Sequence, residues 1–214
     1  MELIGIFGGT FDPVHHGHLR MAQEVLDTTP MSELRLIPCH VPPHRDLPGA
    51  TATTRVKLLE LALAHGDPRL KIDTRELDRD GPSYMVDTLL SLRESLGPSV
   101  SLALILGNDA LQGLPGWSRW TQLTELAHLI LLGRPGDPPA WPSVLEAHLK
   151  ARWQEDPRTL LEAPHGFAIK LAVTQLDISA SQIRRLIQTG RRADYLTPEP
   201  VLSEIQRLGL YRPT

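Results

Sequence analysis

The stretch Met1-Glu-Leu-Ile-Gly-Ile-Phe-Gly-Gly-Thr-Phe-Asp-Pro-Val-His-His-Gly-His-Leu19 predicts a buried strand, a glycine turn and the start of a helix. The apolar run over residues 3–7 suits a parallel strand, and Gly8-Gly9 lets the backbone turn sharply and approach a ligand. His15 and His18 lie three residues apart, so a helix beginning nearby places both imidazoles on one side of its first turn. The free N–H groups and the dipole of a helix start favour an anion. The stretch therefore predicts a phosphate site.

The histidine pair has other interpretations. A metal ion could bind the two rings, but zinc sites usually take three or four protein ligands and one pair supplies two. Each ring could also belong to an ordinary helix start with its hydrogen bonds satisfied. The glycine spacing fits neither GxGxxG nor GxxxxGK[ST], so a nicotinamide-dependent dehydrogenase and a P-loop protein lose their main support.

Length and composition indicate one domain. The chain has 214 residues and a mass of 23.8 kDa, so we expect a single domain over 1–214, with an α/β core over 1–177 and a helical segment over 178–214. A net charge of −3 offers no basic field for a nucleic acid polymer. With one cysteine, no apolar run of ~20 residues and a core strand at the N-terminus, we expect a cytoplasmic protein without membrane contact. The oligomeric state is left open.

Apolar runs alternate with amphipathic stretches, a pattern typical of a doubly wound parallel sheet. We expect strands over 3–7, 33–37, 70–73, 102–106, 128–132 and 168–173, and helices over 19–26, 55–64, 85–96, 179–189 and 198–208. Ligands of such sheets bind outside the carboxyl ends of the strands. Polar segments follow four of the expected strands: 8–18, 40–45, 107–109 and Arg134.

The segment Ile178-Ser-Ala-Ser-Gln-Ile-Arg-Arg185 predicts a second anion site. Ser179 is a good N-cap, Ser181 lies in the first turn, and Arg184 follows one turn later. A transferase needs such a site to hold the outer phosphates of a nucleotide. A plain capped surface helix with solvated arginines explains the same segment and stays open on local evidence alone.

The segment 107–120 joins a carboxylate to aromatic side chains. Asp109 can accept hydrogen bonds from the paired hydroxyls of a ribose, and Trp117 can stack on a flat heterocycle such as a pyridine. Single tryptophans such as Trp117 and Trp120 are more often ordinary core or rim aromatics, and that interpretation stays open on local evidence alone.

These motifs resemble those of one family. His15-His16-Gly17-His18 is similar to the HxGH signature of the nucleotidyltransferase superfamily, and residues 8–13 resemble nicotinate-mononucleotide adenylyltransferases in particular. Residues 178–184 resemble the motif ISxTxxR of that family, with Ser181 in place of threonine. The resemblance implies a Rossmann-like fold with a small C-terminal helical extension, and it implies that Asp109 meets a ribose and Trp117 meets the pyridine.

Further matches run to the end of the chain. Residues 82–89 resemble the family's PSYTxDTL, with Met85 where a threonine usually helps to hold the pyridine carboxylate. Backbone N–H groups at a helix start and Tyr84 would then take over that contact. Residues 42–45 are similar to PPHK with Arg45 in place of lysine, and Arg134 resembles the arginine of the family's RPG turn; each could also be a solvated loop cation. Residues 195–211 resemble the closing helix.

The resemblance implies an enzyme of NAD biosynthesis that transfers AMP from ATP to nicotinate mononucleotide. The residues it implies are catalytic His15, His18 and Arg184; ATP-binding Gly8, Gly9, Thr10, Phe11, His15, His18, Asp109, Arg134, Ser179, Ser181 and Arg184; and mononucleotide-binding His44, Arg45, Ser83, Tyr84, Met85 and Trp117. Mg²⁺ is expected with ATP, through phosphate oxygens and water, and no metal site built by the protein is expected.

Three rival functions remain at this point. A pantetheine-phosphate adenylyltransferase or a cytidylyltransferase would share HxGH, but would not call for the Asp109 and Trp117 pair. A nonenzymatic nucleotide-binding module would keep the pocket. A metal-dependent hydrolase would use Asp12, His15, His18 and His44, and would contain tightly bound zinc.

Overall fold

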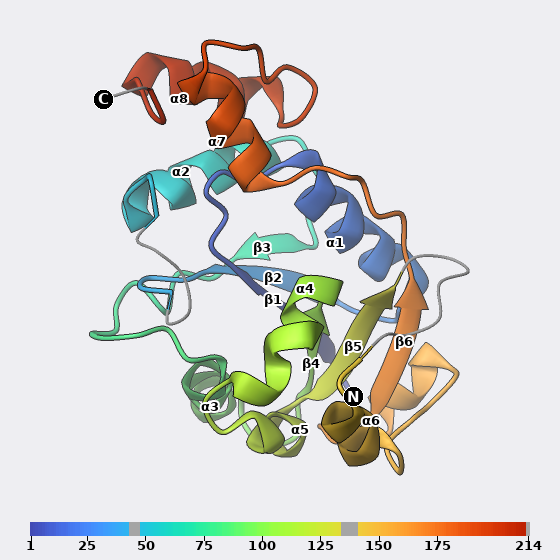
Figure 1. The fold of residues 1–214 in the computed structure, drawn as a ribbon. Helices are drawn as coiled ribbons and strands as arrows, with labels where there is room; N and C mark the ends of the chain where they lie inside the picture. Colours follow the sequence, from blue (N-terminus) through green and yellow to red (C-terminus); the bar gives the residue numbers. More distant parts are fainter. Residues whose placement is uncertain (43–47, 134–140, 213–214) are drawn as a thin grey trace.

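The computed structural model describes residues 1–42, 48–133 and 141–212, and these contain a six-stranded parallel sheet (Figure 1). The strand order is β3-β2-β1-β4-β5-β6. The strands are β1 (Leu3–Gly9), β2 (Glu33–Pro38), β3 (Leu70–Ile72), β4 (Ser101–Leu106), β5 (His128–Gly133) and β6 (Ala168–Ala172). All six predicted strands are therefore confirmed, and so is the doubly wound, Rossmann-like fold. Each runs parallel to its neighbours.

The chain reverses its direction across the sheet between β1 and β4. From β1 it passes outward to β2 and β3, then returns to place β4 on the other side of β1. In folds of this kind, ligands bind in a crevice outside the carboxyl ends of the strands at such a switch point, here β1 and β4. The glycine turn that follows β1 lies at this end of the sheet.

The described part of the chain contains eight α-helices and three 3₁₀ turns. The helices are α1 (His16–Thr28), α2 (Ala52–Leu63), α3 (Met85–Leu96), α4 (Asn108–Gly113), α5 (Leu123–Leu126), α6 (Ser143–Leu149), α7 (Ala180–Gln188) and α8 (Glu199–Leu208); the 3₁₀ turns are η1 (Leu114–Gly116), η2 (Trp120–Gln122) and η3 (Pro157–Leu161). The five predicted helices are present. Helices α4, α5 and α6 were not predicted, because two turns or fewer are too short for a helical apolar period to show.

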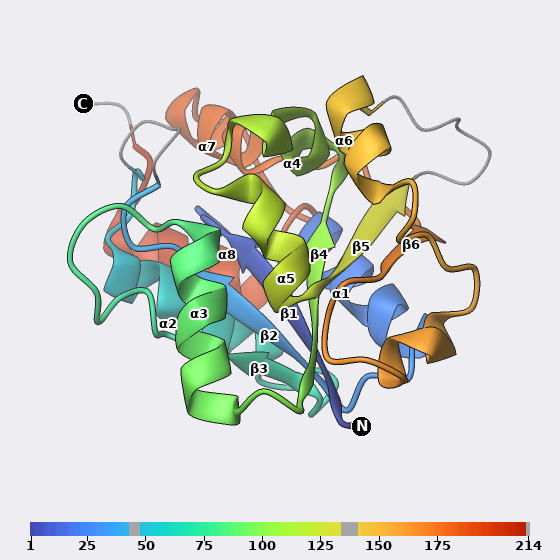
Figure 2. The ribbon, with the colours of Figure 1, turned by 90° about the horizontal axis from the view of Figure 1, so that it is seen from below.

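Two apolar clusters fill the two faces of the sheet. Phe7 of β1 belongs to the cluster shared with α1, α2 and α8, whereas Ile4 and Ile6 belong to the cluster shared with α3 and α6. Successive side chains of a strand point to opposite faces, which explains the division. Figure 2 shows α3, α4, α5 and α6 in front of the sheet, with α1, α2 and α8 behind it.

The C-terminal segment packs on the α1–α2 side of the sheet (Figure 1). Val201, Ile205 and Tyr211 belong to the same cluster as the core residues of β1. The segment also contacts the start of α1, since the Thr197 hydroxyl donates to the Val14 carbonyl at 2.8 Å. Among the described residues, no helix has the length and apolar content needed to cross a membrane.

Candidate active site

The turn after β1 is tightly packed at both of its glycines. A Cβ on Gly8 would lie 2.5 Å from Cε of Met85, and one on Gly9 would lie 2.9 Å from the ring of Phe11. Phe11 is buried and has φ 50°, a left-handed conformation that few residues other than glycine adopt. Such backbone strain clusters at ligand sites because the surrounding structure must hold it in place. The turn therefore has a fixed shape before any ligand arrives.

The two histidines stack on each other at the start of α1. Their ring centroids are 3.7 Å apart with an interplanar angle of 25°. This confirms the prediction that both imidazoles lie on one side of the helix start. The helix begins at His16, with His15 as its N-cap residue. The sequence predicts free N–H groups at this helix start. The His16 N–H, however, donates to the Leu196 carbonyl at 3.0 Å, so this one N–H group is already paired and cannot bind an anion.

Burial controls the protonation of His15. Only 5% of the residue is exposed, and burial, with a smaller contribution from His16, lowers its pKa to about 4. Its Nδ1 atom is buried and has no hydrogen-bond partner. A buried polar atom left unpaired costs about 1–3 kcal/mol and often marks a functional site. The ring is therefore neutral at pH 7, with one nitrogen that carries hydrogen and one that does not.

Aromatic rings hold His18 from the other side. The centroids of Phe11 and His18 are 5.1 Å apart, and those of Phe7 and His18 are 6.3 Å apart, both in edge-to-face geometry. Gly17 leaves room for this stack, since a Cβ there would lie 3.0 Å from the His15 ring. The glycine of the motif is thus required by the packing of the histidine two residues earlier.

Helix α7 brings Arg184 to the turn after β1. One Nη of Arg184 donates to the Asp12 carbonyl at 2.7 Å, and the other donates to the Ser181 hydroxyl at 3.2 Å. Two motifs about 170 positions apart in the sequence therefore share one edge of the sheet. Ser179 is the N-cap residue of α7, as predicted, and its hydroxyl accepts from the Gln182 N–H in a capping box.

The Asp12 carboxylate joins four segments. It accepts from the N–H of Gly49 at 2.8 Å, the N–H of Ala50 at 3.2 Å and the hydroxyl of Tyr211 at 2.6 Å, and Nη1 of Arg184 lies 3.7 Å away. Burial and this carboxylate raise the pKa of Tyr211. No sequence motif indicates this junction, because the partners of Asp12 lie 37 to 199 positions away.

Arg55 of α2 is a second residue that sequence reasoning missed. Only 1% of it is exposed, although arginine is rarely buried. Its guanidinium donates to the carbonyls of Thr10 at 2.6 Å, Cys39 at 2.7 Å and Ala50 at 3.3 Å. It therefore fixes the turn after β1, the end of β2 and the start of α2 against one another.

The residues predicted to hold the mononucleotide lie at the start of α3. Tyr84 is its N-cap residue and Met85 its first residue. The Ser83 hydroxyl accepts from the His40 N–H at 2.9 Å. Since Met85 also reaches the Gly8 position, this helix start adjoins the glycine turn.

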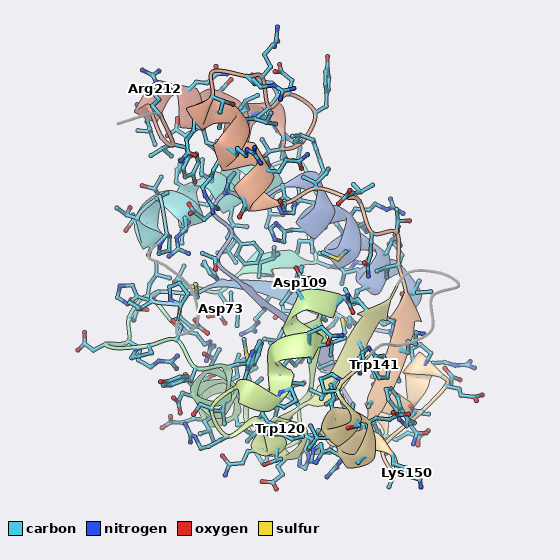
Figure 3. The ribbon with its side chains drawn as sticks, in the orientation of Figure 1. Asp73, Asp109, Trp120, Trp141, Lys150 and Arg212 are labelled. Atoms are coloured by element: carbon cyan, nitrogen blue, oxygen red, sulfur yellow. The ribbon has the colours of Figure 1, made fainter. Side chains whose placement is uncertain are left out.

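Trp117 and Asp109 come from the segment after β4. Trp117 is partly buried against the same apolar cluster as Tyr84 and Met85. Nearby, Arg119 forms an ion pair with Asp87 in the first turn of α3. Asp109 follows the end of β4, as expected, and is exposed in the first turn of α4. Figure 3 shows it at the upper end of that helix.

Three predicted site residues, His44, Arg45 and Arg134, lie outside the described residues. Within the described ranges, no group of three or more histidine, cysteine or acidic side chains is arranged to hold a metal ion. The hydrolase rival would need Asp12 as a ligand, but its carboxylate is 3% exposed and already engaged by Tyr211 and two N–H groups.

Comparisons with known proteins agree with these motifs. A family model described as cytidylyltransferase-like matches residues 6–186. A protein of Methylococcus capsulatus named "Probable nicotinate-nucleotide adenylyltransferase" is 49% identical over 209 residues, which cover 98% of this chain and 99% of that protein. A protein of the same name from Halorhodospira halophila is 48% identical over 211 residues, covering 99% of this chain and 96% of the relative.

A solved structure shares the fold. The "Plasmodium falciparum nicotinic acid mononucleotide adenylyltransferase complexed with NaAD" superposes with a TM-score of 0.74 at 18% identity, covering 99% of this chain and 98% of that one. A structure of the same Plasmodium falciparum protein complexed with APC gives a TM-score of 0.73 at 17% identity, with the same shares covered.

Proposed function

This chain belongs to the nicotinate-nucleotide adenylyltransferases within the cytidylyltransferase-like family, and on that premise we propose that it joins ATP to nicotinate mononucleotide. The products are nicotinate adenine dinucleotide and pyrophosphate, in a step of NAD biosynthesis. The observation that carries the proposal is that the stacked His15 and His18 rings lie in the segment after β1, and that Arg184 donates to the Asp12 carbonyl of the same segment. Three donor side chains for phosphate oxygens thus come to one strand end from distant parts of the chain.

The reaction needs positioning more than proton transfer. An oxygen of the mononucleotide phosphate forms a bond to the α-phosphorus of ATP, and the bond from that phosphorus to the bridging oxygen of pyrophosphate breaks. The attacking phosphate is already ionised at pH 7, so no general base is required. Catalysis then rests on in-line placement and on stabilising the charge that spreads over the phosphoryl oxygens.

We assign the site residues to these tasks. His15 and His18 would donate N–H groups to the triphosphate, and Ser181 and Arg184 would hold the departing pyrophosphate. His15 enters neutral, because its pKa lies near 4. A nearby phosphate anion would favour the imidazolium, so binding of ATP would raise this pKa. Gly8, Gly9, Thr10, Phe11 and Ser179 would shape the pocket around these groups.

The mononucleotide would lie on the α3 side of the crevice. Trp117 would stack on the pyridine, Asp109 would accept from a ribose, and the helix start at Tyr84 would face the carboxylate. Met85 offers no hydroxyl for that carboxylate, so the preference for acid over amide would rest on backbone N–H groups. The roles of His44, Arg45 and Arg134 stay predictions.

We also propose that Mg²⁺ enters with ATP. Mg²⁺ keeps several waters and binds nucleotides chiefly through phosphate oxygens, which fits a site where the Asp12 carboxylate is already occupied. When bound, the ion would neutralise part of the triphosphate charge. A cytoplasmic location stays a prediction, supported by the use of ATP.

Pyrophosphate release by the purified protein tests the proposal. The assay contains ATP and Mg²⁺ with nicotinate mononucleotide, nicotinamide mononucleotide or phosphopantetheine as the acceptor. A strong preference for the nicotinate compound is expected. Equal use of both mononucleotides would keep the reaction and overturn the specificity, whereas release with phosphopantetheine alone would favour the pantetheine-phosphate rival. No release with any acceptor would contradict the enzyme assignment.

A further inference from the structure

We propose that Glu76, a buried residue between β3 and α3, is a positioning residue for the mononucleotide pocket and acts through Ser83 and Thr88. Neither the motifs nor the reaction chemistry calls for a carboxylate at this place. The inference rests on the proposed function, because its readout is the KM for the mononucleotide.

One carboxylate fixes both ends of the turn that starts α3. Glu76 is 2% exposed. It accepts from the Thr88 hydroxyl at 2.5 Å, and the Ser83 hydroxyl also favours its ionised form. Ser83 precedes Tyr84 and Met85, and Thr88 follows them within the first turn of the helix. The two residues proposed to face the pyridine therefore lie between two hydroxyls that act on a single carboxylate.

The contact extends from Glu76 to the end of β2. The Ser83 hydroxyl oxygen accepts the His40 N–H at 2.9 Å, and its hydrogen is available to Glu76. The Ser83 N–H donates in turn to the Val41 carbonyl at 2.9 Å. The His40 ring lies 3.2 Å from the Arg79 carbonyl through Nδ1. Ser83 thus joins the segment after β2 to the start of α3, beside the Glu76 carboxylate.

Charge makes this role specific to a carboxylate. Burial raises the pKa of Glu76, while the hydroxyls of Thr88 and Ser83 and the nearby Arg79 cation favour its ionised form. A carboxylate accepts at both oxygens, so it can serve two hydroxyl donors at once. A glutamine has one acceptor oxygen, and its NH₂ group would meet the second hydroxyl as a donor. That hydroxyl would then lose its acceptor on residue 76, and the start of α3 would lose one of its contacts to this side chain.

The test compares two carboxylates of the same loop. Glu76→Gln keeps the side-chain shape and removes one acceptor. Asp73→Asn is the matched control, because Asp73 lies three residues earlier, pairs with Arg75 and Arg35, and reaches α3 through the Arg75 contact with Ser91. Steady-state rates with varied ATP and varied nicotinate mononucleotide give kcat and both KM values. Thermal unfolding of each variant is measured alongside.

We expect Glu76→Gln to raise the KM for the mononucleotide about tenfold, since one charged hydrogen bond is lost, with the KM for ATP within about twofold of the wild type. Asp73→Asn lowers thermal stability and leaves both KM values unchanged. Thr88→Val removes one donor to Glu76, keeps the side-chain shape and carries the same expectation as Glu76→Gln, so it decides the matter if Glu76→Gln fails to fold.

Two results would overturn the inference. One is an unchanged mononucleotide KM in the folded variant, and the other is a parallel rise of both KM values that the Asp73 control shares. An inactive wild-type protein would instead contradict the proposed function, so the two failures are separable.

Discussion

Gly17→Ala should separate catalysis from stability. The new methyl group would lie 3.0 Å from both Cε1 and Nδ1 of His15, and 3.5 Å from the Ile178 carbonyl oxygen. Carbon atoms in good contact lie about 3.5–4.0 Å apart, so the ring must move by about half an ångström. Its stacking on His18 at 3.7 Å and its burial leave it little space for that movement.

Two effects on stability oppose each other. Alanine is favoured over glycine inside a helix by about 1 kcal/mol, and overpacking of a full core costs about 1–3 kcal/mol. The free energy of unfolding should therefore fall by at most about 2 kcal/mol. Catalysis has no such compensation, because misplacing a reacting group by about 1 Å can cost about a hundredfold in rate. A displacement of half that size predicts a fall in kcat of about tenfold.

The assay is pyrophosphate release at saturating ATP and nicotinate mononucleotide, paired with chemical unfolding. Gly66→Ala is the matched control, because the same added methyl would meet its nearest atom, the Leu63 carbonyl oxygen, at an ordinary 3.5 Å. The control should keep the wild-type kcat. If Gly17→Ala kept a kcat within twofold of the wild type while folded, the reasoning that ties His15 placement to catalysis would be refuted.

Three further predictions concern other parts of the molecule. Burial lowers the pKa of His128 to about 4 in the folded protein. The neutral ring therefore stabilises the fold fully above pH 6.5, and this stabilisation is lost as the pH falls toward 4. Between pH 7 and pH 5 the free energy of unfolding should fall by about 2 kcal/mol from this residue, and the His128→Asn variant should lose less over the same range. Arg55→Lys should destabilise by about 2–4 kcal/mol in chemical unfolding, because one ammonium cannot serve the carbonyls that the guanidinium serves; a loss below 1 kcal/mol would contradict its anchoring role. Trp117→Ala should raise the mononucleotide KM about tenfold through lost stacking, and an unchanged KM would show that the ring does not stack on the pyridine.

The sequence predicted the sheet well because each strand carries its own signal. The apolar runs of β1, β4 and β5 are buried on both faces, so each is nearly continuous, whereas β2, β3 and β6 also contain partly or fully exposed positions. Right-handed crossovers then limit the order in which the strands can pair. The site motifs were found for a similar reason, since His15 and His18 are close in sequence as well as in space.

The buried charges could not be predicted because their partners are distant along the chain. Arg55 lies two residues before Lys57 in α2. From the sequence alone, an arginine at such a position is expected on the solvent-exposed side of the helix. Its acceptors lie 45 residues before it at Thr10 and 16 residues before it at Cys39. Glu76 likewise lies in a segment rich in charged residues, so the sequence predicts an exposed carboxylate there. Only the folded chain brings these groups to their acceptors and donors.

At the carboxyl edge of the sheet, the loops contain buried peptide groups that need hydrogen-bond partners. Three buried charged residues help to supply them: Asp12, Arg55 and Glu76. Loops that approach a ligand leave their peptide groups without the ladder partners of a strand, yet buried N–H and C=O groups must be paired. Asp12 pairs the N–H groups before α2, Arg55 pairs carbonyls of the turns after β1 and β2, and Glu76 reaches the His40 N–H through Ser83. Because these bonds form without substrate, the loops hold their shape in advance, and binding energy need not be spent on ordering them. A variant that removes one of these ions should therefore weaken substrate binding even where it touches no substrate atom.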